Sequence, residues 1–186
     1  MKQVVILGLG NPEKEYENTR HNAGRMAVEY FARKNDMPEF KLDKKSNSLI
    51  SKSGKVLVAL PETFMNKSGI AAAKLFKPRK ENKDLIIIHD DLDLPLGKIK
   101  ISYGKNSGGH KGVESIMRAL KTKNFVRIRI GVISGKRKPT DVLKFIIGKF
   151  KPAEEKEFKK VLKKTTEALE IIINESLDKA MSICNF

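Results

Sequence analysis

The residues best suited to chemistry in this sequence are histidines that stand near potential partners. The chain has 3 histidines: His21 closes a polar segment before an apolar helical pattern, and His89 is followed at once by Asp90. A neutral imidazole can take a proton from water, and a carboxylate stabilises the imidazolium that results. Functional groups gather at the carboxyl ends of strands in α/β sheets, so Asp90 could reach His21 if the strands at residues 3–9 and 85–89 are adjacent. Although a lone histidine is more often structural, this setting favours His21 as a general base.

Other catalytic groups have weaker support. Cys184 is the single cysteine, no base is evident near it, and no Gly-x-Ser-x-Gly elbow presents a serine nucleophile. Asp90, Asp91 and Asp93 crowd behind His89 and could suggest a cation site. Neighbouring residues of a strand point to opposite faces, however, so they cannot easily share one ion. We therefore expect no metal and favour direct attack by water.

Two loops that contain glycine could bind phosphate. Gly8-Leu9-Gly10 follows a predicted strand, but Glu13 stands where a dinucleotide-binding loop has its third glycine and would repel a pyrophosphate. Gly108-Gly109-His110 precedes a predicted helix and is a better anion cradle, although any helix needs a loop before it. We therefore expect no cofactor and leave the role of the second loop open.

Hydrophobic periodicity predicts the elements that must position these groups. Strands are predicted at Gln3 to Leu9, Ser48 to Ser51, Lys55 to Leu60, Leu85 to His89 and Val126 to Ile133, with a hairpin around residues 98–103. One helix is predicted from near Asn22 to before Pro38, and a second, with Asn66 in its first turn, carries Ala71, Ala72, Leu75 and Phe76 and ends before Pro78. Two more are predicted through Val113 to Leu120 and from Pro152 into the tail. This alternation predicts an α/β fold: one three-layer α/β/α domain, residues 1–186, around a twisted mixed sheet. Residues 136–140 and 151–152 are predicted to be mobile loops, and residues 136–152 could form a lid.

The composition indicates a basic protein of the cytoplasm. The net charge is +16, and residues 95–164 hold 20 Lys and Arg against 5 Asp and Glu, whereas residues 1–94 hold 17 against 13. A general compositional drift would spread evenly, so this regional excess favours a surface for a phosphate backbone over a merely solvated basic face. The sequence has no run that could span a membrane, and its lone cysteine suits a reducing compartment. We expect a cytoplasmic monomer.

Several segments occur together in an order that is typical of one family. They are Gly8-Leu9-Gly10-Asn11-Pro12, Tyr16, Thr19 to Gly24, Pro61 to Gly69, His89 to Gly97, Gly108-Gly109-His110 and Arg127 to Gly131. Over nearly the whole chain, the sequence resembles bacterial peptidyl-tRNA hydrolase. Many blocks that match at once are far more specific than any single motif.

The resemblance implies an enzyme whose substrate and partner is peptidyl-tRNA. It would hydrolyse the ester between the peptide and the tRNA ribose, and so recycle tRNA released prematurely from ribosomes. By this resemblance, His21 would activate water, and Asp90 would hold His21 and stabilise its charged form. Asn11 would distinguish blocked peptidyl groups from free aminoacyl groups, because an amide can both donate to and accept from a peptide bond.

The same resemblance assigns further binding roles. Asn66, with Phe64 and Met65, would bind the peptide and position water or the carbonyl, and Tyr16 would contact the tRNA end. Without the resemblance, Asn11 could be a simple turn residue and Asn66 a helix cap. The remaining substrate or phosphate contacts are assigned to His110, Lys98, Lys100, Lys105, Lys111, Arg127 and Arg129.

Two positions depart from the family pattern. Lys111 stands where relatives frequently have an asparagine that contacts substrate, and lysine can donate but not accept hydrogen bonds. A contact there would shift from peptide or water toward phosphate. Ser102 stands where relatives often have a basic residue that clamps tRNA, and Lys100 or Lys105 could compensate.

Two rival functions remain open at this point. One is a non-catalytic RNA-binding protein on the same fold, as in plant organelle relatives that serve RNA splicing. The other is a basic ribosome-associated protein, which would bind RNA in a salt-sensitive way and ignore the peptide. The presence of Asn11, His21, Asn66 and Asp90 together favours the enzyme.

Overall fold

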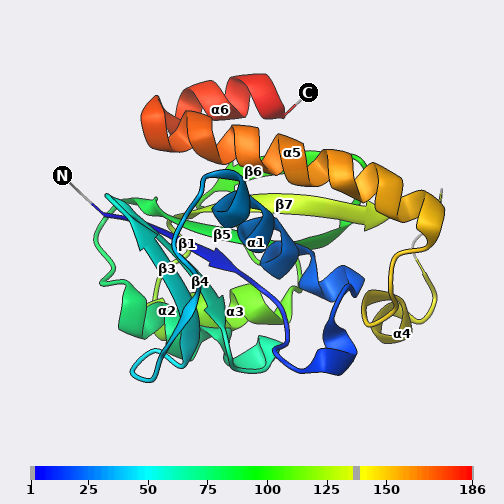
Figure 1. Cartoon of the computed structure of the whole chain (residues 1–186), viewed down its shortest axis with the longest axis horizontal. Helices are drawn as coiled ribbons and strands as arrows, with labels where there is room; N and C mark the ends of the chain where they lie inside the picture. The colour runs from blue at the N-terminus through cyan, green and yellow to red at the C-terminus, as the bar shows by residue number, and fades with distance from the viewer. Residues whose placement is uncertain (1–2, 136–138, 186) are drawn as a thin grey trace.

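A seven-stranded mixed sheet forms the centre of the molecule (Figure 1). The computed structural model describes residues 3–135 and 139–185. The strands are β1 Val4–Gly8, β2 Lys41–Asp43, β3 Ser48–Ser53, β4 Val56–Pro61, β5 Asn82–Pro95, β6 Ile99–Tyr103 and β7 Phe125–Ile133. They lie in the order β2-β3-β4-β1-β5-β7-β6. The central strands β4, β1, β5 and β7 are parallel, whereas β2–β3, β3–β4 and β6–β7 pair antiparallel.

Helices cover both faces of this sheet. They are α1 Ala23–Lys34, α2 Ser68–Leu75, α3 Lys111–Leu120, α4 Val142–Ile146, α5 Pro152–Asn174 and α6 Leu177–Cys184, with short 3₁₀ turns η1 Lys14–Tyr16, η2 Arg20–Asn22 and η3 Met65–Lys67. In Figure 1, α1, α5 and α6 lie on one side of the sheet and α2 and α3 on the other. The predicted three-layer α/β/α domain with a mixed sheet is therefore confirmed.

The apolar strands are continuous because both sheet faces are buried. In β1, Ile6 packs in the core under α1 and α5, whereas Val5 and Leu7 pack in the core under α2 and α3. All three side chains are at most 2 % exposed. Burying an aliphatic side chain of this size contributes about 1.5–3 kcal/mol, so these contacts fix the helices on the sheet.

The predicted hairpin around residues 98–103 is wrong. This segment contains one strand, β6, and its partner is β7, which follows α3 in the sequence. In the connection from β5 to β6, the chain turns at Gly97, where φ is +93°. This connection crosses the end of β7, which lies between the two strands in the sheet. A Cβ at Gly131 would lie 2.0 Å from the Pro95 oxygen, so this crossing requires glycine.

Smaller elements also differ from expectation. Strand β2 and helix α4 were not predicted, because 3 and 5 residues are too few to show a clear period. Asn66 lies in η3, just ahead of α2, rather than in the first turn of that helix. Part of the predicted loop and lid, residues 136–138, falls outside the described residues. Among the helices that are described, none combines the length and apolar character needed to cross a membrane.

Candidate active site

The sheet brings His21 to Asp90 across a long separation in sequence. Strands β1 and β5 are parallel neighbours, and the amide of Leu9 donates to the Ile88 oxygen at 3.0 Å. Helix α1 then packs closely on β5, since a Cβ at Gly24 would lie 2.0 Å from that same oxygen. This close approach places η2, which ends just before α1, beside the residues that follow Ile88. The two strands are therefore adjacent, as the predicted pairing of His21 with Asp90 required.

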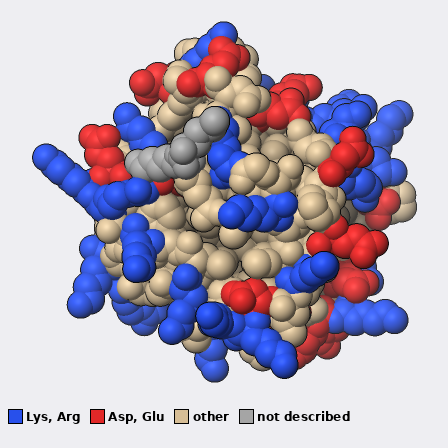
Figure 2. All heavy atoms as spheres, turned by 60° about the vertical axis from the view of Figure 1, so that its left-hand side comes forward, with Lys and Arg blue, Asp and Glu red and all other residues tan. Residues whose placement is uncertain are grey.

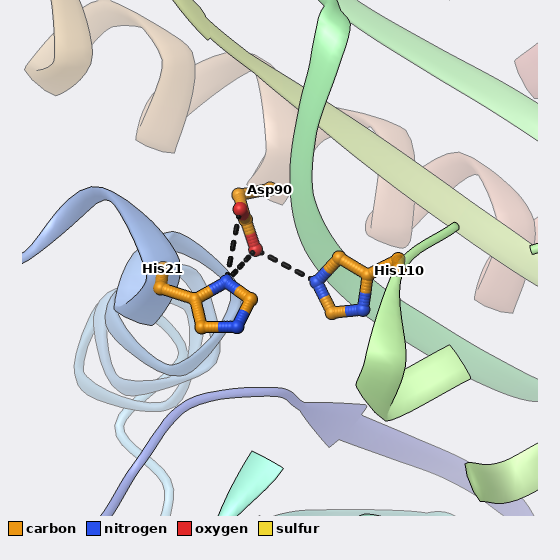
Figure 3. A group of neighbouring side chains, drawn as sticks. All are labelled: His21, Asp90 and His110. Carbon is orange, nitrogen blue, oxygen red and sulfur yellow. Dashed lines mark hydrogen bonds and ion pairs between the residues drawn. The ribbon is translucent and has the colours of Figure 1, made fainter. Parts of the chain in front are cut away.

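The hydrogen bonds of His21 define its tautomer. Its Nδ1 lies 2.9 and 3.0 Å from the two carboxylate oxygens of Asp90. An ionised carboxylate can only accept, so Nδ1 carries the hydrogen and Nε2 keeps its lone pair. Figure 3 shows that Nε2 points away from Asp90. The imidazole can therefore receive a proton at Nε2 while the carboxylate holds the opposite side of the ring.

His110 binds the same carboxylate but has no free ring nitrogen. Its Nε2 lies 2.8 Å from Oδ1 of Asp90, and its Nδ1 accepts from the Val113 amide at 3.4 Å, which caps α3. Figure 3 shows Asp90 between the two imidazole rings. The resemblance placed His110 among the substrate contacts, and its bond to Asp90 was not foreseen. The one signal in the sequence was the position of His110 at a predicted helix start after two glycines, which marked this loop as a candidate binding site.

His89 lies within the interior beside this cluster. Its Nδ1 donates to the main-chain oxygen of Asp90 at 2.6 Å, and its Nε2 accepts from Nη1 of Arg127 at 3.4 Å. Burial lowers the pKa of His89 well below its usual range, so the ring is neutral. Both nitrogens are occupied, which leaves His21 as the histidine of this cluster with a ring nitrogen free for proton transfer.

Opposing influences set the ionisation of the His21–Asp90 pair. Burial lowers the pKa of His21, but the charge of Asp90 and the hydrogen bond to it outweigh burial and raise that pKa above the usual value. Burial likewise raises the pKa of Asp90, whereas the charges and hydrogen bonds of His21 and His110 lower it far below its usual range. Asp90 is therefore ionised at neutral pH and stabilises a proton on His21.

Asn11 is held by three hydrogen bonds that leave its side-chain NH₂ group free to donate. The side chain of Asn22 accepts from the main-chain amide of Asn11 and donates to the main-chain oxygen of Asn11, both at 2.9 Å. Oδ1 of Asn11 accepts from the Met65 amide at 2.8 Å. Met65 is buried, whereas Asn66 and Phe64 are exposed on either side of it. The structure thus joins Asn11 to η3, and leaves the side chain of Asn66 open to solvent.

A cleft of about 440 Å³ opens over the pair of His21 and Asp90. Its other lining residues include the loop before α3, with the exposed Lys111, and apolar side chains of α4. Lys111 also lies 3.5 Å from Glu114, a weak exposed contact within α3. Tyr16 is half-buried on η1. Its main-chain oxygen accepts from the hydroxyl of Thr19, so it belongs to the segment that leads into η2. The cleft therefore has one polar side, with His21 and Asp90, and one apolar wall.

Comparison with known proteins agrees with this arrangement. The family model for peptidyl-tRNA hydrolase matches residues 5–186. The chain belongs to the peptidyl-tRNA hydrolase family. The peptidyl-tRNA hydrolase of Thermodesulfovibrio yellowstonii is 40% identical over 195 residues, with 98% of each chain covered. That of Aquifex aeolicus is 40% identical over 184 residues, covering 97% of this chain and 95% of the relative. The crystal structure of the Acinetobacter baumannii enzyme superposes with a TM-score of 0.88 at 30% identity, covering 98% of this chain and 94% of that one.

A second cavity in the structure is basic. It has a volume of about 340 Å³ and shares Ser107 and Gly108 with the cleft over His21 and Asp90. Lys100 and Lys105 are exposed at its rim, and Arg129 lines it while its Nε donates to Asp91 at 2.6 Å. Ser102, one of the two departures from the family pattern, also lines this cavity and is buried.

Arg127 cannot act as the free phosphate ligand that the resemblance suggested. Its side chain is buried, and its guanidinium donates to the main-chain oxygens of Asn106 at 2.6 Å and Ser107 at 3.4 Å. Burial lowers its pKa to about 10, so it is still charged at neutral pH. Arg127 therefore holds the loop that carries His110 and separates the two cavities.

The metal site considered from the sequence does not form among the described residues. His89 points inward and uses both nitrogens, so it cannot join the neighbouring aspartates. His21, Asp90 and His110 have ligand atoms within 4.8 Å of one another. Their nitrogens lie 2.8 and 2.9 Å from Asp90 Oδ1, whereas ligand atoms on a tetrahedral zinc are roughly 3.3 Å apart. The spacing is that of hydrogen bonds.

Proposed function

We propose that this member of the peptidyl-tRNA hydrolase family hydrolyses the ester between peptide and tRNA with His21 as the general base. The observation that carries the proposal is the tautomer of His21, since Nδ1–H is bound by Asp90 and Nε2 is free. Water in the cleft would give a proton to Nε2 as its oxygen attacks the ester carbonyl. The imidazolium would then protonate the departing ribose oxygen, which yields a free peptide acid and tRNA.

Each neighbouring residue has a distinct part in this proposal. Asp90 stabilises the imidazolium, and His110 holds Asp90 from the other side at 2.8 Å. Asn66 is exposed on η3 and would position the carbonyl or water, with Phe64 and Met65 beside the peptide. Lys111 and Tyr16 would contact the tRNA end. We propose that the protein acts as a monomer in the cytoplasm.

Asn11 is proposed to select blocked substrates. Its Oδ1 is already bound by Met65, so its NH₂ group is the part that can donate to the first peptide carbonyl. A free aminoacyl group lacks that carbonyl and would leave this donor unpaired.

Replacing Asn11 with alanine should therefore reduce discrimination. We expect kcat/KM for N-acetylaminoacyl-tRNA to fall by about 10- to 100-fold, with much less change for the unblocked substrate, because the variant cannot make this buried hydrogen bond. Hydrolysis of both substrates by Asn11→Ala measures the ratio directly. Asn174→Ala, at the far end of α5, is the control. An unchanged ratio in Asn11→Ala would contradict the selective role.

The basic cavity is proposed to hold a phosphate of the tRNA. Charge alone does not locate this surface, because Figure 2 shows Lys and Arg side chains spread over a whole face rather than gathered in one patch. The cavity is distinguished by its position, since it shares a loop with the catalytic cleft. Lys100, Lys105 and Arg129 would supply the positive charge, and Lys100 and Lys105 would compensate for Ser102.

Removing two of these lysines should weaken tRNA binding. We expect Lys100→Ala with Lys105→Ala to raise the Kd for tRNA and to reduce the slope of log K against log salt by about one for each lysine that neutralises a phosphate. Binding measured over a series of salt concentrations tests this. Lys52→Ala with Lys74→Ala, on β3 and α2, removes the same charge elsewhere. Equal slopes in both double variants would place the bound phosphate outside the cavity.

A purely RNA-binding role has less support. The cleft holds a base with a free ring nitrogen and an ionised partner, neither of which a binder of phosphate requires. Release of peptide from N-acetylaminoacyl-tRNA separates the two functions. A protein that binds this tRNA without releasing the peptide would favour the binding role.

A further inference from the structure

Arg20, directly before His21, is the centre of a buried set of contacts. Its side chain is only 5 % exposed. Nη2 donates to Glu154 at 2.6 Å, and Nη1 donates to the main-chain oxygens of Lys149 at 2.9 Å and Phe145 at 3.4 Å. The guanidinium also lies over the ring of Phe145, 4.4 Å from its centroid. Arg20 therefore connects η2 with the α4 segment and the start of α5.

Glu154 is itself held from several directions. It accepts from the hydroxyl of Ser134 at 2.5 Å and from the amide of Lys151 at 2.7 Å, in addition to Arg20. Burial raises the pKa of Glu154, but these hydrogen bonds and the charge of Arg20 outweigh burial and lower it. Buried ion pairs are costly to desolvate and are often replaceable by apolar residues without loss of stability. A contribution to stability alone is therefore a weak account of this one.

The turn that carries His21 is fixed at three points. A 3₁₀ turn of 3 residues has little stability of its own, yet all side chains of η2 are buried. Arg20 binds Glu154, His21 binds Asp90, and Asn22 binds the main chain at Asn11. The main chain of Arg20 also donates to the Gly148 oxygen at 3.1 Å. The place of the imidazole thus depends on the anchor that comes immediately before it.

The same arginine holds the wall that faces the base. Val142, Leu143 and Ile146 of α4 line the cleft together with His21. Nη1 of Arg20 donates to the main-chain oxygens of Phe145, within α4, and of Lys149, just beyond it. One side chain therefore contacts both the turn that carries the base and the helix that supplies the apolar wall of the same cleft.

We propose that Arg20 is a positioning residue for hydrolysis: through Glu154 and the main chain of residues 145–149, it fixes His21 against Asp90 and holds the α4 wall beside the base. This inference rests on the proposed role of His21. Arg20 is not among the residues that line the cleft, so it acts through its neighbours. A displacement of about 1 Å at a reacting group can cost 100-fold in rate, so an anchor one residue away can control turnover.

Arg20→Met tests the proposal, because it removes the guanidinium and keeps an apolar stem. We expect kcat for N-acetylaminoacyl-tRNA to fall by about 10- to 100-fold, with KM changed by less than about threefold. The acid limb of the profile of kcat/KM against pH should also move to lower pH. Looser contact with Asp90 leaves burial as the dominant influence on the pKa of His21, and burial lowers it.

Arg79→Met is the matched control. It breaks the ion pair of Arg79 with the buried carboxylate of Asp84, at the amino end of β5 and away from the cleft. We expect a lower melting temperature in both variants, and unchanged kcat and acid limb in Arg79→Met alone. Glu154→Gln, which keeps an oxygen for Arg20, should retain several-fold more activity than Glu154→Ala.

The outcomes are separable. Wild-type kcat and acid limb in a folded Arg20→Met variant would overturn the positioning role, as would an equal loss in Arg79→Met. If Arg20→Met does not fold, equal kcat in Glu154→Gln and Glu154→Ala would overturn it instead. Full activity in His21→Ala contradicts the proposed base, whereas full activity in Arg20→Met beside an inactive His21→Ala contradicts only the positioning role.

Discussion

Replacement of His21 with alanine is expected to lower kcat for hydrolysis of N-acetylaminoacyl-tRNA by about 10²- to 10⁴-fold, the range for loss of a general base. The affinity for tRNA should stay nearly unchanged, because the basic cavity lies on the other side of the loop that ends at His110. Single-turnover release of the peptide measures the first quantity, and tRNA binding at fixed salt measures the second.

His21→Asn separates proton transfer from packing. The asparagine amide can still donate to Asp90, so the buried carboxylate keeps a partner, but the side chain cannot accept a proton. We expect the same loss of kcat as in His21→Ala, with a smaller change in melting temperature. Turnover equal to wild type in either folded variant would contradict the proposed mechanism.

The sequence could single out His21 but could not assign roles to all three histidines. From local sequence, His21 and His89 were both candidates, and His110 was grouped with the substrate contacts. Their roles differ because of partners that are distant in sequence: Nε2 of His89 accepts from Arg127, and Nε2 of His110 binds Asp90. Tautomers follow from such tertiary hydrogen bonds, which hydrophobic periodicity does not reveal.

The prediction of the fold succeeded for elements with long apolar patterns. It failed where a strand pairs with another strand that is distant in the sequence. The strand through Leu85 and the helix from Pro152 gave strong signals, and both are present as β5 and α5. The order of strands depends instead on crossings such as the one over Gly131, which places β7 between β5 and β6. A run of alternating residues shows that a strand forms but not which strand lies beside it.

The roles of Asn66, Tyr16 and Lys111 stay predictions for a different reason. Each is a side chain that is open to solvent or half-buried, and each was assigned through the family resemblance. The roles of Asn11 and Asp90 are predictions as well, but buried hydrogen bonds fix the orientation of these two side chains in the protein itself. The orientation of an exposed side chain that binds substrate is set by the substrate, so neither the sequence nor the unbound protein defines it.

Asp90→Asn should be the other severely impaired variant, and its pH dependence should change in a defined direction. We expect kcat at the plateau to fall by about 10²- to 10³-fold, because the neutral amide no longer stabilises the imidazolium of His21. In the wild type, Asp90 raises the pKa of His21 against burial, so activity rises with pH through a value above the ordinary histidine pKa. Without the charge, burial lowers the pKa of His21, and the acid limb should move to lower pH.

Asp91→Asn is the matched control for that shift. Asp91 is the next residue and carries the same charge, but its carboxylate binds Arg129 rather than a histidine. If direct contact sets the pKa of His21, the acid limb should move far less in Asp91→Asn than in Asp90→Asn, since a charge without that hydrogen bond acts only through the screened field. Equal shifts in the two variants would contradict this. They would mean that the pKa of His21 is set by the general negative charge at the end of β5 and not by the hydrogen bond between His21 and Asp90.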